Sequence, residues 1–523
     1  MVVDYGVTIM FEVTVEDLLG RIGRLKTKSG KKIETPVFLP VINPVTQDIS
    51  AKWMKENLGA EIVITNAYIL YKRLRDEVLS KTVHGVLSFD GIVMTDSGGY
   101  QILEYGGVEA SPQEIALFEE EIKTDIAVPL DVPTGLSDRK HAEESVDKTL
   151  KNLEETLKIL DSRGARNCLW VGTIQGGTHL DLVTYCAEKV KKMNFDMYAL
   201  GSPTPLMEGY KFSKLFEMII AAKTSIEYGK PLHLFGAGHP MIFSFIIALG
   251  VDMFDSASYY LYAKDGRYFT ETGTMKLDKM DYLPCSCPIC SGTSIQELME
   301  LPMKDRVDAI AKHNLYVCFR EIAEIKQAIK DGRLFELLEI RARSHPNLYH
   351  AFKELMNNER LLEIMEQHTP IYSRRGLNFY DTLSLNRPEA RRARRRLLEN
   401  IFKEREKKNA ILIPYTMKVN LQKLEKTLPE AAISEYDLLL YGSPYGLIPI
   451  EIKYVYPFSQ TVFPHSLILE EQVVDVVIRQ IYNAGYREIV IIEARNKYLK
   501  EAIYRVIEKL GEKGIQVKTI SLK

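Results

Sequence analysis

The sequence predicts an α/β protein whose main part is a (β/α)8 barrel, followed by smaller domains. Eight short apolar runs lie between residues 36 and 255, separated by amphipathic stretches at intervals of roughly 20 to 40 residues. These intervals leave room for a helix between most runs, and mostly apolar runs are typical of parallel strands covered on both faces. Eight such repeats favour a barrel over the alternative, a doubly wound open sheet. The predicted strands are residues 37–41, 62–65, 92–95, 126–130, 169–174, 197–200, 232–235 and 251–254.

We expect four parts along the chain. Residues 1–276 form the barrel, with a short β-rich segment before Pro36, and residues 277–360 form a cysteine-containing subdomain that completes it. Residues 361–409 form a basic helical connector. The last part, residues 410–523, is predicted to be a smaller α/β module. Its expected strands are 437–441, 448–452, 488–492 and 516–520, and its expected helices are 469–484 and 499–513.

Composition limits the classes of protein to consider. A chain of 523 residues is long enough for about two to four domains, and 46% hydrophobic with 26% charged residues is ordinary for a globular protein. The formal net charge of −2 does not indicate a nucleic-acid binder, so any basic surface must be local. The N-terminus has no basic signal-like region, and the longest apolar stretch, 241–254, is too short to span a bilayer. We therefore expect a cytoplasmic protein with no membrane partner.

Polar residues follow most of the predicted strands. Asp96 and Asp131 follow the third and fourth strands, Gln175 the fifth, and Asp255 the eighth. A lone aspartate in such a place is more often a helix N-cap, and glycine pairs usually serve turns. In a barrel, however, the carboxyl ends of all strands face one rim, which is where active sites lie. The set therefore predicts one pocket that contains three carboxylates.

Such a pocket has a definite chemistry. Two carboxylates about 5 Å apart suit double displacement at the anomeric carbon of a sugar, with one forming a covalent glycosyl-enzyme and the other transferring the proton. A third carboxylate could accept hydrogen bonds from the N–H donors of a planar heterocycle such as guanine. Tyr100 and Phe235 could stack on that ring, although ordinary core packing is the alternative for both.

A cysteine cluster predicts one structural zinc ion. Cys285, Cys287 and Cys290 supply three thiolates within six residues, and His313 follows in a helical region as the fourth ligand. Three cysteines and one histidine make a closed tetrahedral site with no position open for catalysis. His345 and His350 are the competing choices for the fourth ligand.

A basic segment provides the local positive charge. Residues 387–408 contain ten Lys or Arg and four Glu. Such a segment fits contact with RNA phosphates, although a solvated helix face is the usual alternative for a run of charges. The residues expected to bind RNA are Arg391, Arg392, Arg394, Arg395 and Arg396.

Several of these motifs together resemble the tRNA-guanine transglycosylase family. Thr95-Asp96-Ser97-Gly98-Gly99-Tyr100-Gln101 is similar to its active-site signature, and Met253-Phe254-Asp255-Ser256 to its second aspartate motif. The order and spacing of the three cysteines and His313-Asn314 resemble its zinc site. Leu130-Asp131-Val132-Pro133-Thr134 and Leu234-Phe235-Gly236-Ala237-Gly238-His239-Pro240 resemble the archaeal branch. The resemblance covers residues 5–350 and is weaker beyond them.

The resemblance implies a reaction and its residues. Guanine 15 of the tRNA D-arm would be exchanged for 7-cyano-7-deazaguanine (preQ0), a step toward archaeosine. Asp255 matches the aspartate that bonds to ribose and Asp96 the catalytic acid/base, although either has been assigned as the nucleophile within the family. The positions implied for base binding are Ser97, Gly98, Tyr100, Asp131, Gln175, Ala199, Phe235 and Gly236.

One departure from the family concerns the C-terminal part. Archaeal members commonly end in a small β-rich RNA-binding domain of the PUA type, whereas residues 438–523 read as α/β. We expect that a separate PUA-domain protein supplies this function, or that residues 387–408 and the C-terminal module compensate. The resemblance also implies a homodimer.

Four alternatives compete with this interpretation. A non-catalytic tRNA-binding subunit, and the related enzyme that converts the installed nitrile to an amidine, are disfavoured because both aspartates and Asp131 are present. A bacterial-type enzyme acting at position 34 is disfavoured by the long C-terminal extension. A generic barrel glycosidase has no use for a zinc cluster or a basic helix.

Overall fold

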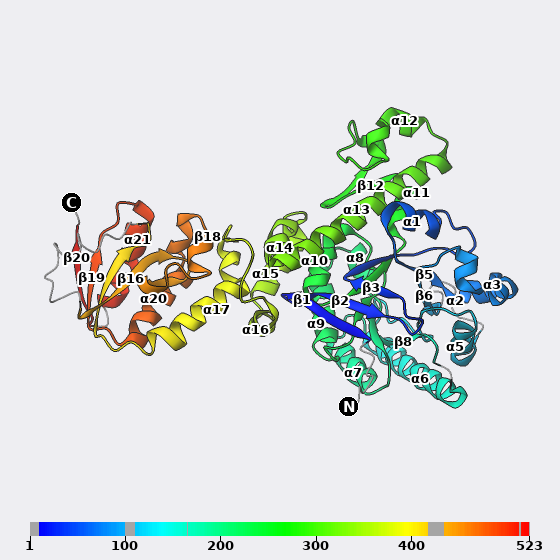
Figure 1. The fold of residues 1–523 in the computed structure, drawn as a ribbon, viewed down its shortest axis with the longest axis horizontal. Helices are drawn as coiled ribbons and strands as arrows, with labels where there is room; N and C mark the ends of the chain where they lie inside the picture. The colour runs from blue at the N-terminus through cyan, green and yellow to red at the C-terminus, as the bar shows by residue number, and fades with distance from the viewer. Residues whose placement is uncertain (1–9, 100–109, 165, 417–433, 512–513, 522–523) are drawn as a thin grey trace, which may run out of the picture. The chain divides into compact units, whose positions relative to one another are not determined.

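The computed structural model describes residues 10–99, 110–164, 166–416, 434–511 and 514–521 (Figure 1). The chain divides into two compact units. The first contains residues 1–330 and 337–354, and the second contains residues 331–336 and 355–523.

The first unit is built on a barrel of eight parallel strands, so the predicted fold class is confirmed. The sheet order is β4-β11-β10-β9-β8-β7-β6-β5, and a parallel bridge between Val41 and Ile64 joins its two ends. This closing bridge excludes the open-sheet alternative. The strands are β4 (Val37–Pro40), β5 (Ile62–Asn66), β6 (Ile92–Asp96), β7 (Ile126–Ala127), β8 (Leu169–Ile174), β9 (Met197–Leu200), β10 (Leu232–Leu234) and β11 (Met253–Ser256).

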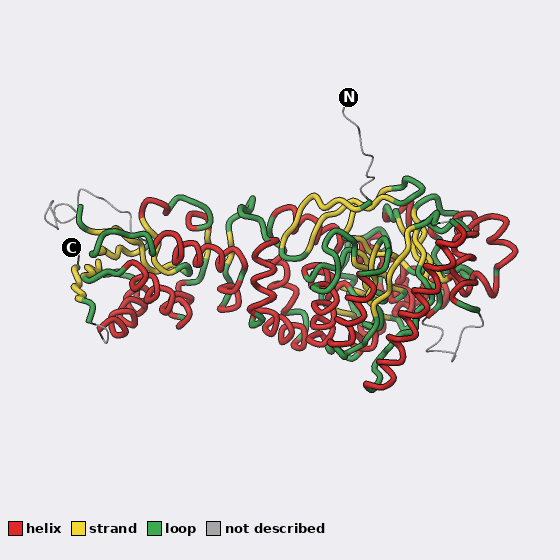
Figure 2. Tube along the Cα trace, turned by 90° about the horizontal axis from the view of Figure 1, so that it is seen from below, coloured by secondary structure: helices red, strands yellow, loops and turns green. Residues whose placement is uncertain are grey.

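Helices surround the strands, as Figure 2 shows. Local sequence sets where several of them begin, because Ser50, Asn66, Ser111 and Asp138 each accept a hydrogen bond from a first-turn backbone N–H. The helices are α1 (Ala51–Leu58), α2 (Ala67–Arg73), α3 (Arg75–Leu87), α5 (Pro112–Glu121), α6 (Arg139–Arg163), α7 (Leu180–Lys191), α8 (Thr204–Glu208), α9 (Phe212–Lys223), α10 (Pro240–Ala248) and α11 (Ser258–Lys264).

A small antiparallel sheet covers the N-terminal end of the barrel. It consists of β1 (Phe11–Asp17), β2 (Gly20–Lys26) and β3 (Lys32–Thr35), and it corresponds to the predicted β-rich segment. Phe11, Leu25 and Ile33 from this sheet share one hydrophobic core with barrel residues such as Ile62 and Met94. The sheet therefore closes the end of the barrel opposite the predicted pocket.

A subdomain with the cysteine cluster follows the last barrel strand. It begins with the hairpin of β12 (Arg267–Thr270) and β13 (Gly273–Lys276). A turn of 3-10 helix at Cys290–Gly292 leads to α12 (Ile295–Glu300), and the chain then continues through α13 (Met303–Asp331), α14 (Leu334–Ala342) and α15 (Pro346–Met356). The subdomain thus brings a cysteine loop and a long helix together.

The second unit is an α/β module with one core. Its sheet order is β17-β16-β15-β19-β20, parallel except for β17, and β15 was not predicted because we placed a domain boundary there. Residues Leu377, Ala390 and Phe402 of the expected connector share the core of this module. The elements are α16 (Glu359–His368), β14 (Leu377–Asn378), α17 (Pro388–Arg396), β15 (Asn409–Pro414), β16 (Tyr436–Ser443), β17 (Gly446–Pro449), β18 (Thr461–Val462), α20 (Glu471–Ala484), β19 (Glu488–Ile492), α21 (Lys497–Gly511) and β20 (Gln516–Ile520).

The helices differ from those that cross a bilayer. Among the described residues, none is both long and apolar enough to span a membrane.

Candidate active site and metal centre

Three aspartates lie at the carboxyl end of the barrel. Asp96 is the last residue of β6, Asp131 follows β7 and Asp255 lies in β11. Burial raises the pKa of Asp96 to about 7, and the negative charges of Asp131 and Asp255 add to the rise. Hydrogen bonds from the Gly98 backbone and from Asn66 Nδ2, at 3.4 Å, oppose it. The three carboxylates therefore share one electrostatic environment, as expected for a single pocket.

Asp131 is held by a buried amide. Gln175 Nε2 donates a hydrogen bond to Asp131 Oδ2 at 2.7 Å. Gln175 Oε1 in turn accepts from Ser202 Oγ at 2.9 Å and from the Thr134 backbone N–H at 3.2 Å, so the orientation of the amide is fixed. Burial raises the pKa of Asp131 to about 6, although the Gln175 hydrogen bond lowers it. Asp131 and Gln175 thus form a rigid polar wall.

Asp255 is oriented by two donors. His233 Nε2 lies 2.8 Å from Asp255 Oδ1, and the Gly236 backbone N–H donates to the same oxygen at 3.1 Å. Both contacts use Oδ1, and no hydrogen bond to Oδ2 is formed by the residues that the structure describes. His233 is fully buried in β10, and its Nδ1 has no hydrogen-bond partner among the described residues. The sequence analysis missed His233, because its place inside a short apolar strand looks like an ordinary core position.

Glycines allow the loops to approach these side chains. A Cβ atom at Gly99 would lie 2.2 Å from Asp131 Oδ1, and one at Gly201 would lie 2.2 Å from Gln175 Nε2. Neither distance is tolerable between real atoms, so a larger residue at either position would displace the Asp131 carboxylate or the Gln175 amide.

The other described residues that were predicted to bind the base lie in the same region. Ser97, Gly98 and Ala199 are buried around the carboxyl ends of the strands. Gly236 follows β10, and the Phe235 ring packs edge-on to His233 with 4.8 Å between centroids. The predicted stacking partner of Phe235, Tyr100, lies outside the described residues. The positions found are compatible with one base-binding pocket.

The four predicted metal ligands come together. The ligand atoms of Cys285, Cys287, Cys290 and His313 all lie within 4.8 Å of one another. His313 Nδ1 lies 3.3 Å from Cys290 Sγ and 3.5 Å from Cys287 Sγ. The cluster could hold one metal ion.

Surrounding residues fix the orientation of His313. Its Nε2 lies 2.9 Å from the Phe269 carbonyl oxygen, which leaves Nδ1 facing the thiols, and its ring stacks on Tyr268 at 3.6 Å between centroids. Such support is typical of a metal-binding histidine. The competing ligands lie elsewhere: His345 stacks on Tyr210, and His350 Nε2 lies 3.3 Å from Glu354.

The arginines of α17 differ in their exposure and in the groups that they contact. Arg394 is buried and donates to the Leu385 carbonyl, so no phosphate can reach it in this structure. Arg392 donates to the Pro370 carbonyl at 2.9 Å, and Arg391 pairs with Glu359 at 2.7 Å. Arg395 and Arg396 are exposed, although Arg395 also contacts Glu366. RNA contact by this helix stays a prediction, and it now concerns mainly its last two arginines.

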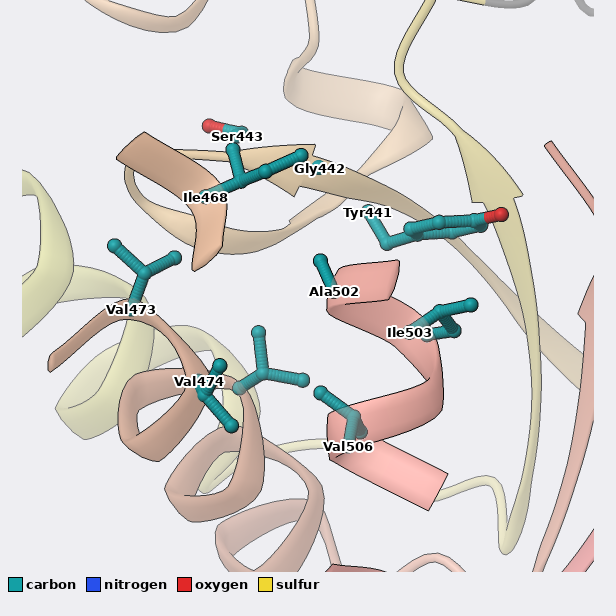
Figure 3. Close-up of a pocket in the computed structure, with 10 residues that line it drawn as sticks. Tyr441, Gly442, Ser443, Ile468, Val473, Val474, Ala502, Ile503 and Val506 are labelled. Atoms are coloured by element: carbon teal, nitrogen blue, oxygen red, sulfur yellow. The ribbon is translucent and has the colours of Figure 1, made fainter. Parts of the chain in front are cut away.

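A pocket in the second unit is of a different kind (Figure 3). It lies between the end of β16, α20 and α21, and most of the side chains that line it are valines, isoleucines and alanine. Its two hydroxyl groups already have partners, since Tyr441 donates to the Ile492 carbonyl and Ser443 accepts from the Tyr445 N–H. The pocket therefore offers no acid, base or ligand-binding group.

Comparison with known proteins gives a consistent result. A sequence profile of the queuine tRNA-ribosyltransferase family matches residues 17–347. The chain is 43% identical to a tRNA-guanine(15) transglycosylase of Sulfolobus acidocaldarius, over 87% of this chain and 89% of the relative. It is 40% identical to the protein of that name from Methanosarcina mazei, over 97% of each chain. The protein of that name from Methanocaldococcus jannaschii is 40% identical, over 88% of this chain and 70% of the relative.

Proposed function

The chain belongs to the queuine tRNA-ribosyltransferase family, within its tRNA-guanine(15) transglycosylases, and we propose that it exchanges guanine 15 of the tRNA D-arm for preQ0. The general activity, tRNA-guanine transglycosylation, is that of a pentosyltransferase. The finer assignment, to preQ0 and a covalent intermediate, is supported by the three carboxylates at one rim of the barrel.

In the first step, Asp255 attacks C1′ of the ribose through Oδ2. The C1′–N9 bond breaks, its electron pair goes to N9 of guanine, and an ester forms between Asp255 and the ribose. His233 and the Gly236 N–H hold Oδ1, so the attacking oxygen has a fixed direction. The guanine must first leave its base stack in the tRNA, and this costs free energy. Binding of the tRNA to the protein offsets that cost.

Asp96 moves the proton. With a pKa of about 7, it can protonate N9 of the departing guanine and then accept the N9 proton of the incoming preQ0. The new N9 then attacks C1′, and the bond from C1′ to Asp255 breaks. One glycosidic bond is exchanged for another, so the reaction needs no energy input.

Asp131 and Gln175 bind the heterocycle. A carboxylate and an amide held 2.7 Å apart by a hydrogen bond can accept from and donate to the edge of guanine or a 7-deazaguanine. Phe235 and Tyr100 would stack on its faces. The backbones of Ser97, Gly98, Ala199 and Gly236 complete the pocket in this proposal.

Zinc would be held by Cys285, Cys287, Cys290 and His313. The donor set of three thiols and one imidazole is the one that structural zinc prefers. When bound, the ion stabilises the fold of the subdomain and takes no part in the exchange.

One observation carries the proposal: Asp96, Asp131 and Asp255 all lie at the carboxyl ends of strands of one closed barrel. The test is to incubate the protein with tRNA and radiolabelled guanine and then to locate the label. We expect label at position 15, displaced by added preQ0. Label at position 34 would indicate the bacterial-type exchange, and no label despite tight tRNA binding would indicate a non-catalytic subunit.

A further inference from the structure

Two segments of the second unit, residues 371–380 and 453–462, lie side by side. Between them, β14 and β18 pair in parallel, with Leu377 opposite Thr461 and Asn378 opposite Val462. The rings of Tyr372 and Tyr456 are 5.2 Å apart. The two segments therefore form one continuous strip (β18 and α17 are labelled in Figure 1).

The strip exposes large apolar side chains that a folded domain normally covers. Tyr454 is 80% exposed and Tyr372 is 58% exposed, and Ile371 and Val462 are also largely open to solvent. Isolated apolar residues on a surface are normal, whereas several on adjoining segments indicate a binding surface. We call this set the aromatic–basic surface; it consists of Ile371, Tyr372, Arg374, Arg375, Tyr380, Lys453, Tyr454, Val455 and Val462.

The charged groups on this surface are all positive. The two segments contain Arg374, Arg375 and Lys453 and no acidic residue. Arg374 forms no ion pair within the described residues, Arg375 Nε lies 4.0 Å from Asp331, and Lys453 Nζ lies over the Tyr454 ring at 4.6 Å. Glu451, just outside, is paired with Arg405 at 3.4 Å. Cations beside exposed aromatic rings suit a nucleic acid, because the cations can contact its phosphates and the rings can stack on its bases.

The aromatic–basic surface adjoins the basic helix α17. Arg392 donates to the carbonyls of Thr369 and Pro370, directly before Ile371. The helix then continues to the exposed Arg395 and Arg396. The hydrogen bonds of Arg392 therefore connect α17, which carries the predicted RNA-contacting arginines, to the segment that carries Tyr372.

We propose that the aromatic–basic surface binds unpaired nucleotides of tRNA by stacking bases on Tyr372 and Tyr454. The proposal rests on the proposed function, which makes tRNA the macromolecular substrate. Base faces are accessible in single strands and loops and hidden in a duplex, so tyrosine stacking selects unpaired segments. The charge favours RNA over a protein partner, because the two segments carry three cations and no acidic residue, and RNA is a polyanion.

The experiment measures Kd and its salt dependence for the full chain with a fluorescent single-stranded RNA of twelve nucleotides and with whole tRNA. We expect Tyr372→Ala with Tyr454→Ala to raise the Kd for both by roughly tenfold or more. The slope of log K against log salt should not change, because no cation is removed. Arg374→Ala with Lys453→Ala should make that negative slope less steep, by about 0.7 for each phosphate that the protein no longer neutralises.

Two controls separate stacking from a general effect. Tyr372→Phe with Tyr454→Phe keeps both rings and should bind like the parent chain. Tyr504→Ala removes another exposed tyrosine of this unit, on α21 beside Lys500, and should leave the Kd unchanged. A loss in the Phe variants equal to that in the Ala variants, or no loss in either, would overturn the proposal.

Guanine exchange is measured in parallel on the parent chain. If the parent labels position 15 while the tyrosine variants bind RNA normally, the surface proposal fails and the proposed function stands. If the parent binds RNA through these tyrosines and exchanges no guanine, the proposed function fails instead.

Discussion

The two ends of the barrel treat buried carboxylates in opposite ways. At the N-terminal end, burial raises the pKa of Asp252, but Arg21 and Lys223 lower it more, and Arg21 Nε lies 2.7 Å from Asp252 Oδ1. Asp125 at the same end has its pKa lowered to about 2, against burial, by hydrogen bonds from His84, the Val93 N–H and Lys31. At the carboxyl end, the pKa of Asp96 and of Asp131 is raised, with other carboxylates nearby.

Asp252 and Asp255 make this difference clearest, because they are only three residues apart: Asp252 directly precedes β11 and Asp255 lies in its second half. The charge of Asp252 is compensated by Arg21 and Lys223, and its pair with Arg21 of β2 links the small sheet to the barrel. Asp255 is contacted at Oδ1 by His233 and by the Gly236 N–H, and it forms no ion pair with a lysine or arginine of the described residues. Charge compensation therefore divides the barrel into a stabilising end and a reactive end. The following predictions test that division.

The largest effect is expected for Asp255→Asn. Without the attacking carboxylate, exchange should fall by about 10⁴-fold, and the covalent tRNA adduct on a denaturing gel should disappear. The melting temperature should change little. Retention of the adduct would assign the nucleophile to Asp96 instead.

Asp96→Asn should lower exchange by about 10² to 10⁴-fold, because the proton carrier is removed. It should also stabilise the fold. The folded pKa of about 7 exceeds the unfolded value, so the native state binds the extra proton and the parent chain loses stability as pH rises from about 4 to 7. At pH 8 the variant should be more stable by up to about 4 kcal/mol, and at pH 4 the two should be alike.

Denaturant unfolding at several pH values measures this difference between Asp96→Asn and the parent. Asp131→Asn is the matched variant at the same rim, and its gain should be complete by about pH 6. Equal stability of the Asp96 variant and the parent at pH 8 would contradict the view that the reactive end lacks compensation.

At the other end, Asp252→Asn should destabilise the protein by about 3 to 5 kcal/mol, since it leaves Arg21 buried without a counter-charge. The exchange rate of the molecules that stay folded should not change. Asp181→Asn is the control, because it breaks an exposed pair with Arg139 at 2.6 Å and should cost about 1 kcal/mol or less. A similar loss of stability in both variants would argue against a special role for the buried pair.

The smallest effect is expected at His233. Replacing it by leucine removes one donor to Asp255 and should lower kcat about tenfold or more with little change in KM. His233→Gln keeps an N–H donor and should recover part of the rate. If both variants lose activity together with thermal stability, His233 is a packing residue and does not position Asp255.

Much of the architecture was predictable because its signals are local. The apolar runs marked all eight barrel strands, and the carboxyl ends of parallel strands must meet at one rim, so Asp96, Asp131 and Asp255 were placed together from their positions after strands. The cysteines lie within six residues, and only His313 had to come from a distance. His233, by contrast, gave no signal, since a histidine inside an apolar strand resembles any core residue.

The arginine-rich segment shows the limit of sequence patterns. Composition predicted a positive helix, but it could not distinguish the buried Arg394 from the exposed Arg396. The burial of Arg394 depends on where Leu385 comes to lie, because Arg394 donates to the Leu385 carbonyl. Sequence patterns also gave no sign that Tyr372 and Tyr456 come into contact, because their segments are about eighty residues apart.

The sequence by itself determined the barrel, the rim to which its polar residues belong and the four candidate metal ligands, since periodicity and spacing are properties of neighbouring residues. Only the tertiary structure decided which carboxylates are compensated. Arg21 reaches Asp252 across 231 residues of sequence, whereas Asp96 finds other carboxylates nearby. A pKa depends on burial and on the nearest charges in space, and long-range folding alone sets both.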